Sequence, residues 1–192
     1  MIGGSCTGKT TASRELAALL GVPHIELDAL HHDPGWQEAP ADVFQERVRA
    51  ALTAASDGWV ADGNYHGKLG TAVLEHADTV VWLDLPHHVA LRRVLWRTTR
   101  RSLTREELWN GNRESFRGAF SRDSIVWWVI ARHGTHRKKW PPRLARFTHL
   151  QVVRLRSPRD VREWLQSIQA TESMSGSSNG SERQKTPPLA ET

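Results

Sequence analysis

The sequence has little of what marks several common classes of protein. Its 192 residues contain one cysteine, Cys6, which excludes an internal disulfide framework and agrees with a reducing compartment. No apolar run approaches the roughly 20 residues needed to cross a bilayer. The N-terminus lacks a basic region followed by an apolar core and a small-residue cleavage site. We therefore expect a cytoplasmic protein, and the length favours one domain.

Positive charge is in excess and unevenly distributed. The formal net charge is +5 and the sequence pI is about 10.0. Arginines gather between Arg92 and Arg117, and basic residues gather again between Arg132 and Lys139, whereas most of the first half is balanced or acidic. This pattern favours an anionic partner, which could be a nucleotide, a polyphosphate or nucleic acid.

A phosphate-binding loop opens the chain. The pattern G-x-x-x-x-G-K-[ST] is matched without a gap by Gly3, Gly4, Ser5, Cys6, Thr7, Gly8, Lys9 and Thr10. Such a loop surrounds phosphates with backbone N–H groups at the positive end of a helix dipole. We expect Lys9 to bridge the outer phosphates of ATP, Thr10 to bind Mg²⁺ through its hydroxyl, and Thr11 to reach an inner phosphate.

The strand that should precede this loop is very short, since only Met1 and Ile2 stand before it. Either the natural start lies upstream, or the first strand is unusually short. We expect the former.

Strand and helix patterns alternate along the rest of the chain. Apolar strands are predicted at 24–28, 59–61, 79–85 and 150–155. One helix is predicted at 10–20, a second begins after an N-cap at Asp42, a third begins at Pro86, and a fourth follows Ser157-Pro158. This order predicts a three-layer α/β P-loop NTPase fold with a mostly parallel sheet. The segment Thr171 to Thr192 is rich in small and polar residues, and we expect it to be a disordered tail.

Two aspartates stand where strands end, at the edge where ligands bind in an open α/β sheet. Asp62 could hold Mg²⁺ through water or orient the acceptor, and its alternative role is to form a turn. Asp28 could contact an acceptor hydroxyl or accept its proton, and its alternative is a capping or turn role. Asp84 precedes Pro86, and we expect it to be a helix cap.

Several motifs together resemble the adenylate-kinase-like P-loop kinases, most closely the group labelled DNA topology modulation proteins, over Met1 to Ile168. They are the phosphate loop, Leu27-Asp28-Ala29-Leu30 with Pro34-Gly35-Trp36, Asp62-Gly63-Asn64-Tyr65, the run Ala77 to Pro86, and Arg93 with Arg97. The resemblance implies an ATP- and Mg²⁺-dependent phosphotransferase domain over residues 1–170. It also implies a basic helical lid at about 87–147, whose Arg93 and Arg97 clamp ATP; an alternative is that the arginines form a solvated face.

The resemblance leaves the acceptor open. Adenylate kinases carry Asp-Gly-Phe-Pro-Arg where this chain has Asp62-Gly63-Asn64-Tyr65-His66, so the arginine that holds the acceptor phosphate is absent; His66 or Lys68 could replace it. The aspartate Asp28 is similar to that of shikimate and gluconate kinases, whose acceptors present hydroxyls. The adjacent His31, His32 and Asp33 could be metal ligands, but no second cluster at zinc-site spacing supports them. We expect an ordinary surface loop, and the alternative is a loop that contacts substrate. Trp36 is expected near the acceptor or as a loop anchor.

These patterns predict an enzyme that transfers the terminal phosphoryl group of ATP to a nucleotide, a nucleoside or another small metabolite. One alternative is an ATP-binding regulator associated with nucleic acid, suggested by the basic residues, although no DNA-reading motif is found. The other is a phosphate-loop binding module without turnover. The joint presence of Lys9, Thr10, Asp62 and the arginines argues against this last alternative.

Overall fold

The computed structural model describes residues 1–104, 110 and 137–180. The sequence also predicts an apolar helix that includes 125–131. This segment and the arginines at 113, 117, 122 and 132 lie outside the described residues. The predicted lid at 87–147 is described only at its two ends and at Asn110.

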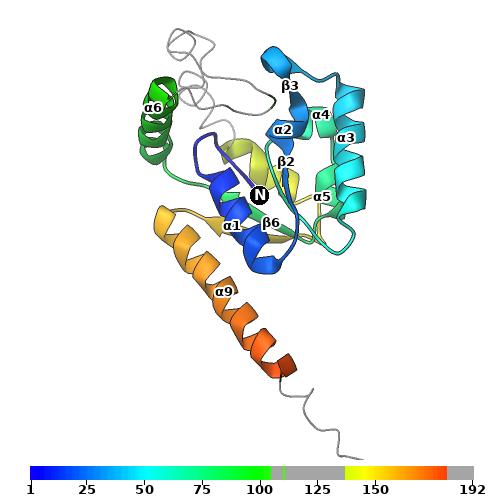
Figure 1. Cartoon of the computed structure of the whole chain (residues 1–192), viewed down its shortest axis with the longest axis vertical. Coiled ribbons are helices and arrows are strands. Elements are labelled where there is room, and N and C mark those ends of the chain that lie inside the picture. Colours follow the sequence, from blue (N-terminus) through cyan, green and yellow to red (C-terminus); the bar gives the residue numbers. More distant parts are fainter. Residues whose placement is uncertain (105–109, 111–136, 181–192) are drawn as a thin grey trace, which may run out of the picture.

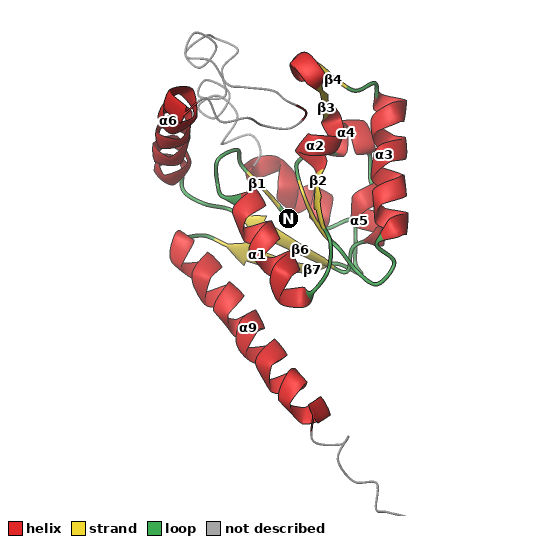
Figure 2. Cartoon of the chain, in the orientation of Figure 1, coloured by secondary structure: helices red, strands yellow, loops and turns green. Residues whose placement is uncertain are grey.

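The sheet is built from parallel strands that come from distant parts of the chain. In one group β1 (Ile2–Gly3) pairs with β6 (Thr79–Leu83), which pairs with β7 (Gln151–Leu155). In the other, β2 (His24–Glu26) pairs with β5 (Val60–Asp62). Met1 links the groups, because its carbonyl accepts a hydrogen bond from the Gly63 N–H at 3.3 Å. The strands therefore follow the order β2, β5, β1, β6, β7 (Figure 2).

Helices cover both faces of this sheet. On one face lie α1 (Lys9–Leu20) and the long α9 (Pro158–Gly180), which pack against each other. The C-terminal part of α9 extends beyond the body of the molecule (Figure 1). On the other lie α3 (Ala41–Ala54), α5 (Ala72–His76) and a helical segment at 137–144. The helix α6 (His87–Thr104) follows β6.

Alternation along β6 explains why both faces must be covered. Val80 and Trp82 pack with Trp140 and Leu144 of the 137–144 helix. Their neighbours Val81 and Leu83 point to the opposite face, where α9 contributes partly buried apolar side chains. A strand that is apolar on both sides is typical of a parallel sheet between two helical layers. The predicted three-layer α/β fold with a mostly parallel sheet is confirmed.

Short elements connect β2 to α3 and β5 to α5. The helix α2 (Leu27–His31) is followed by an antiparallel hairpin of β3 (His32–Asp33) and β4 (Gln37–Glu38) around the 3-10 turn η1 (Pro34–Trp36). The helix α4 (His66–Leu69) follows β5. The aromatic rings of Phe44 and Tyr65, centred 5.0 Å apart, pack these connections against α3.

Three local expectations differ from the structure. Asp28 lies in α2 rather than in a strand, because β2 pairs Glu26 with Asp62, the last residue of β5, and a longer strand would have no partner. Asp42 lies in the first turn of α3, and the N-cap position is taken by Pro40. A free Asp42 carboxylate there still complements the helix dipole.

The third difference concerns the expected tail. The structure continues α9 to Gly180, past Thr171, where we expected disorder to begin. The hydroxyls of Thr171 and Ser173 donate to the carbonyls of Ser167 and Gln169, at 3.0 and 2.8 Å. Polar composition prevents packing, but it does not stop a helix that has already been nucleated. The rest of the expected tail, 181–192, lies outside the described residues.

No helix in the described part of the chain is both long and apolar enough to cross a bilayer.

Candidate functional site

The phosphate loop joins β1 to α1 in a conformation that depends on glycine at two positions. Gly8 caps α1 with a φ of 92°, a left-handed conformation that costs glycine little. Gly3 has a φ of 150°, and a Cβ there would lie 2.7 Å from the backbone oxygen of Leu83. The buried hydroxyl of Thr7 donates to the Gly4 carbonyl at 2.8 Å and closes the loop. The motif therefore folds as predicted, between a strand and a helix.

Lys9 is the centre of the charge arrangement at the loop. Its Nζ donates to the carbonyls of Gly3 and Gly4 at 3.1 and 3.0 Å. Burial lowers the pKa of Lys9, while the negative charges of Asp28 and Asp62 act against this shift and the positive charge of Arg97 adds to it. Asp28, Asp62 and Arg97, which the sequence predicts to share a site with Lys9, therefore each lie within electrostatic reach of it.

Asp62 connects β5 to the phosphate loop. Its Oδ2 accepts a hydrogen bond from the Thr10 hydroxyl at 2.7 Å, and only 3% of its surface is exposed. Hydroxyl and carboxylate oxygens are the hard ligands that Mg²⁺ prefers. These two side chains fit the predicted metal site. Within the described residues, no group of three or more His, Cys, Asp or Glu side chains could hold a metal, so His31, His32 and Asp33 do not form one.

The residues after Asp62 contact two further parts of the site. Asn64 donates through Nδ2 to the Gly3 carbonyl at 2.5 Å, and its Oδ1 accepts from the Gly3 N–H at 3.3 Å. Tyr65 donates its hydroxyl hydrogen to Oδ1 of Asp28 at 2.5 Å. The motif at 62–65 thus touches the start of the loop, the start of α1 and the acidic residue of α2.

Two arginines of α6 meet the phosphate loop differently. Arg93 donates through Nη1 to the Thr7 carbonyl at 2.5 Å, and a Cβ on Gly8 would lie 2.9 Å from this nitrogen. Arg93 therefore braces the loop backbone. Arg97, one helical turn further, acts on Lys9 through its charge. Cys6 faces the same helix and packs against Ala90 and Val94.

The cations considered for the acceptor phosphate are already engaged. Lys68 donates to Oε2 of Glu38 at 2.7 Å and lies 3.3 Å from Nε2 of His31. His66 packs its ring edge-on against Trp140, with centroids 5.0 Å apart. His31 is buried among aromatic rings, and this burial, followed by the charge of Lys68, lowers its pKa.

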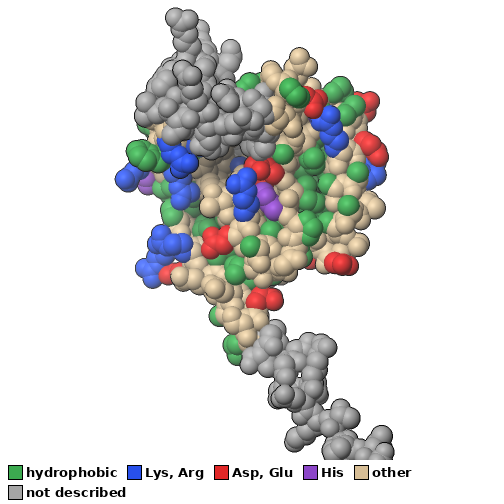
Figure 3. Space-filling model, viewed as in Figure 1, with side chains coloured by type: hydrophobic (Ala, Val, Ile, Leu, Met, Phe, Trp, Pro, Cys, Tyr) green, Lys and Arg blue, Asp and Glu red, His purple; other side chains and the backbone are tan. Residues whose placement is uncertain are grey.

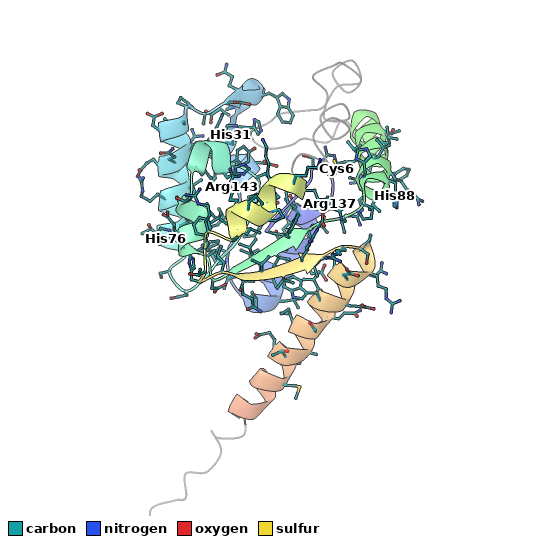
Figure 4. All side chains as sticks on the ribbon, turned by 180° about the vertical axis from the view of Figure 1, so that it is seen from behind. Cys6, His31, His76, His88, Arg137 and Arg143 are labelled. Carbon is teal, nitrogen blue, oxygen red and sulfur yellow. The ribbon has the colours of Figure 1, made fainter. Side chains whose placement is uncertain are left out.

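Asp84 is not the helix cap that we expected. It is 4% exposed, and its carboxylate accepts hydrogen bonds from Arg154 at 2.6 and 2.9 Å and pairs with Arg137 at 2.9 Å. The Arg154 guanidinium also lies 4.4 Å from the centre of the Trp82 ring. A buried carboxylate requires such donors, which a short sequence pattern around Pro86 does not reveal. Arg137 begins the described part of the helix that also carries Arg143 (Figure 4).

Other predicted residues are less engaged. Thr11 is exposed on the first turn of α1, and Trp36 lies at the tip of the hairpin, 39% exposed, with its ring 5.6 Å from that of His32. Sequence reasoning missed His24, whose Nε2 lies 2.8 Å from Oδ1 of Asp62. A histidine at the start of a short strand carries no motif that could have indicated this contact. On the face shown in Figure 3, acidic, basic and histidine side chains lie next to one another.

The comparisons with known proteins do not assign the chain to a family. No family model matches the chain, and no curated protein sequence matches it. A matching solved structure is that of shikimate kinase from Bacteroides thetaiotaomicron, with 16% identity and a TM-score of 0.46, over 89% of this chain and 95% of that one. At this similarity we base the function on the geometry of the site alone.

Proposed function

We propose that the protein is an ATP- and Mg²⁺-dependent phosphotransferase whose acceptor is a hydroxyl of a small metabolite or nucleoside. The observation that supports this most strongly is the pair of carboxylates around Lys9, which have different partners. Asp62 is bound to Thr10, the expected metal ligand, whereas Asp28 is bound to Tyr65 on the side of α2. One carboxylate is thus available to the metal and the other to the acceptor.

The nucleotide would be held by the loop. Backbone N–H groups between Gly3 and Thr10 and the N-terminus of α1 favour bound phosphate. Lys9, which rests on the Gly3 and Gly4 carbonyls, would exchange these contacts for phosphate oxygens. Mg²⁺, when bound by Thr10 and Asp62, would neutralise phosphate charge. Arg93 would keep the loop in shape, and Arg97 would add positive charge near the migrating group.

The position of Asp28 is the reason for proposing a hydroxyl as the acceptor group. A carboxylate near Lys9 can orient an acceptor hydroxyl and take its proton as the new oxygen–phosphorus bond forms and ADP leaves. A monophosphate acceptor would instead need a cation, and Lys68 is already paired with Glu38. The described contacts therefore favour a hydroxyl over a phosphate as the nucleophile. No contact in the described ranges favours nucleic acid as the partner. Only the positive net charge supports that alternative.

The test is ADP release measured against a panel of hydroxyl and monophosphate acceptors. Lys9→Ala should abolish ATP turnover while the fold is retained, because Lys9 contacts the loop and not the core. Arg49→Ala, which removes an exposed basic side chain of α3, is the control and should behave like the wild type. Undiminished turnover in Lys9→Ala would reject the phosphate-loop mechanism. Stimulation by monophosphates alone would reject the hydroxyl acceptor.

A further inference from the structure

His24 and Asp62 lie on neighbouring parallel strands with their side chains on the same face of the sheet. The register pairs His24 with Val60 and Glu26 with Asp62, so His24 and Asp62 are two positions apart. Side chains two positions apart share a face. Val60 packs against Ala12 and Leu16 of α1, which identifies this face as the one beneath α1. Asp62 therefore lies between the ring of His24 on β2 and the hydroxyl of Thr10 on α1.

Each carboxylate oxygen of Asp62 contacts one polar side chain among the described residues. Oδ1 lies 2.8 Å from Nε2 of His24, and Oδ2 lies 2.7 Å from the Thr10 hydroxyl. Since a carboxylate only accepts hydrogen bonds, Nε2 must be the donor. The side chains of His24 and Asp62 are 14% and 3% exposed, so water contributes little to holding either of them. The two contacts fix the rotation of the carboxylate.

We propose that His24 is a positioning residue of the magnesium site, which holds Asp62 by Oδ1 so that Oδ2 stays directed at Thr10. The inference rests on the proposed function, because it concerns the metal that would accompany the nucleotide. Residues that orient a metal-binding carboxylate through a hydrogen bond commonly matter for metal affinity, which falls by about 10- to 100-fold when they are removed. A histidine that only satisfied a buried carboxylate would affect stability and leave the metal's contribution to nucleotide binding unchanged.

The experiment measures this contribution directly. The dissociation constant of ADP is determined by calorimetry in EDTA and again in saturating Mg²⁺, and the ratio of the two constants gives the enhancement by the metal. We compare the wild type with His24→Leu, which removes the donor and retains apolar volume. We also compare it with His24→Asn, whose shorter side chain withdraws the donor from Asp62. His76→Leu is the control, because His76 is exposed and its ring nitrogen lies 2.8 Å from the carbonyl of Ala72 in its own helix (Figure 4).

We expect the enhancement by Mg²⁺ to fall by about tenfold or more in His24→Leu, with ADP affinity in EDTA unchanged. His76→Leu should retain the full enhancement. If His24→Leu does not fold, His24→Asn provides the same comparison. An enhancement equal to the wild type would overturn the inference, and so would an equal loss of affinity in EDTA, which would show a structural role. A wild type that binds no ADP, or binds it without help from Mg²⁺, would instead reject the proposed function itself.

Discussion

The hydroxyl of Tyr65 donates a hydrogen bond to Oδ1 of Asp28, and this bond joins the end of β5 to the acidic residue of α2. Tyr65 is the only tyrosine of the chain, so its ionisation can be observed without interference from another tyrosine. Burial, the charge of Asp28 and the hydrogen bond to it raise the pKa of Tyr65 above the ordinary value of 10.0. The bond therefore has a measurable signature.

We expect Tyr65 to remain protonated in the folded protein well above pH 10.0. Because the folded pKa is raised, the stability linked to Tyr65 is fully present below pH 10.0 and is lost as the pH rises above it. Tyrosinate absorbance should therefore rise together with alkaline unfolding rather than before it. If Tyr65 titrated in the folded protein at the ordinary pKa of tyrosine, this would contradict its contact with Asp28.

Two variants separate the causes of this shift. Asp28→Asn removes the negative charge and should lower the pKa of Tyr65 relative to the wild type, while the contribution of burial remains. Tyr65→Phe keeps the ring against His31 and Phe44, and it should lose less stability than the wild type on the same alkaline change. Equal alkaline losses in the wild type and Tyr65→Phe would show that another group is responsible.

Asp84 gives the second prediction, which concerns stability. In Asp84→Asn the guanidinium groups of Arg137 and Arg154 lose a buried carboxylate with which both interact. Breaking a buried ion pair from one side costs about 3–5 kcal/mol, and we expect the lower end here because both arginines are partly exposed. Urea unfolding measures the change. The control is Glu163→Gln, which removes the exposed pair with Arg159 and should cost less than about 1 kcal/mol.

The sequence could predict the elements that depend on local patterns. Glycines followed by Lys9 and Thr10 indicate a phosphate loop, and the continuous apolar run of β6 indicates a strand covered on both faces. The meeting of Asp62 with Thr10 also follows, because strand ends and the phosphate loop share one edge of the sheet.

What could not be predicted depends on register and on distant contacts. The end of β2 is set by the length of β5, its partner, so the sequence around Asp28 does not show that α2 begins there. The burial of Asp84 depends on Arg154, which lies 70 positions later, and His24 meets Asp62 only through the pairing of two strands. No local pattern carries such information.

The third prediction separates the two arginines of α6. Arg93→Met removes the brace on the Thr7 carbonyl, so it should weaken ATP binding. Arg97→Met removes a positive charge that acts near Lys9, so it should lower kcat more than ATP affinity, because charge moves during transfer. The loss in kcat could reach the order of 10³ if Arg97 acts as other arginine fingers do. Steady-state kinetics and ADP calorimetry distinguish the two, and equal behaviour of both variants would contradict the division of roles.

The last prediction concerns Asp28 and decides between two kinds of acceptor. If the acceptor offers a hydroxyl, Asp28 orients it and takes its proton, so Asp28→Asn should keep ATP affinity and lose acceptor-stimulated ADP release by about 10²- to 10⁴-fold. If the acceptor is a nucleoside monophosphate, its phosphate is already ionised and needs no base. Asp28→Asn should then be mild, whereas Lys68→Met should raise the acceptor KM, since Lys68 would have to leave Glu38 for the phosphate. Both variants are compared with an acceptor identified in the panel, and wild-type kinetics in Asp28→Asn would remove Asp28 from the active site.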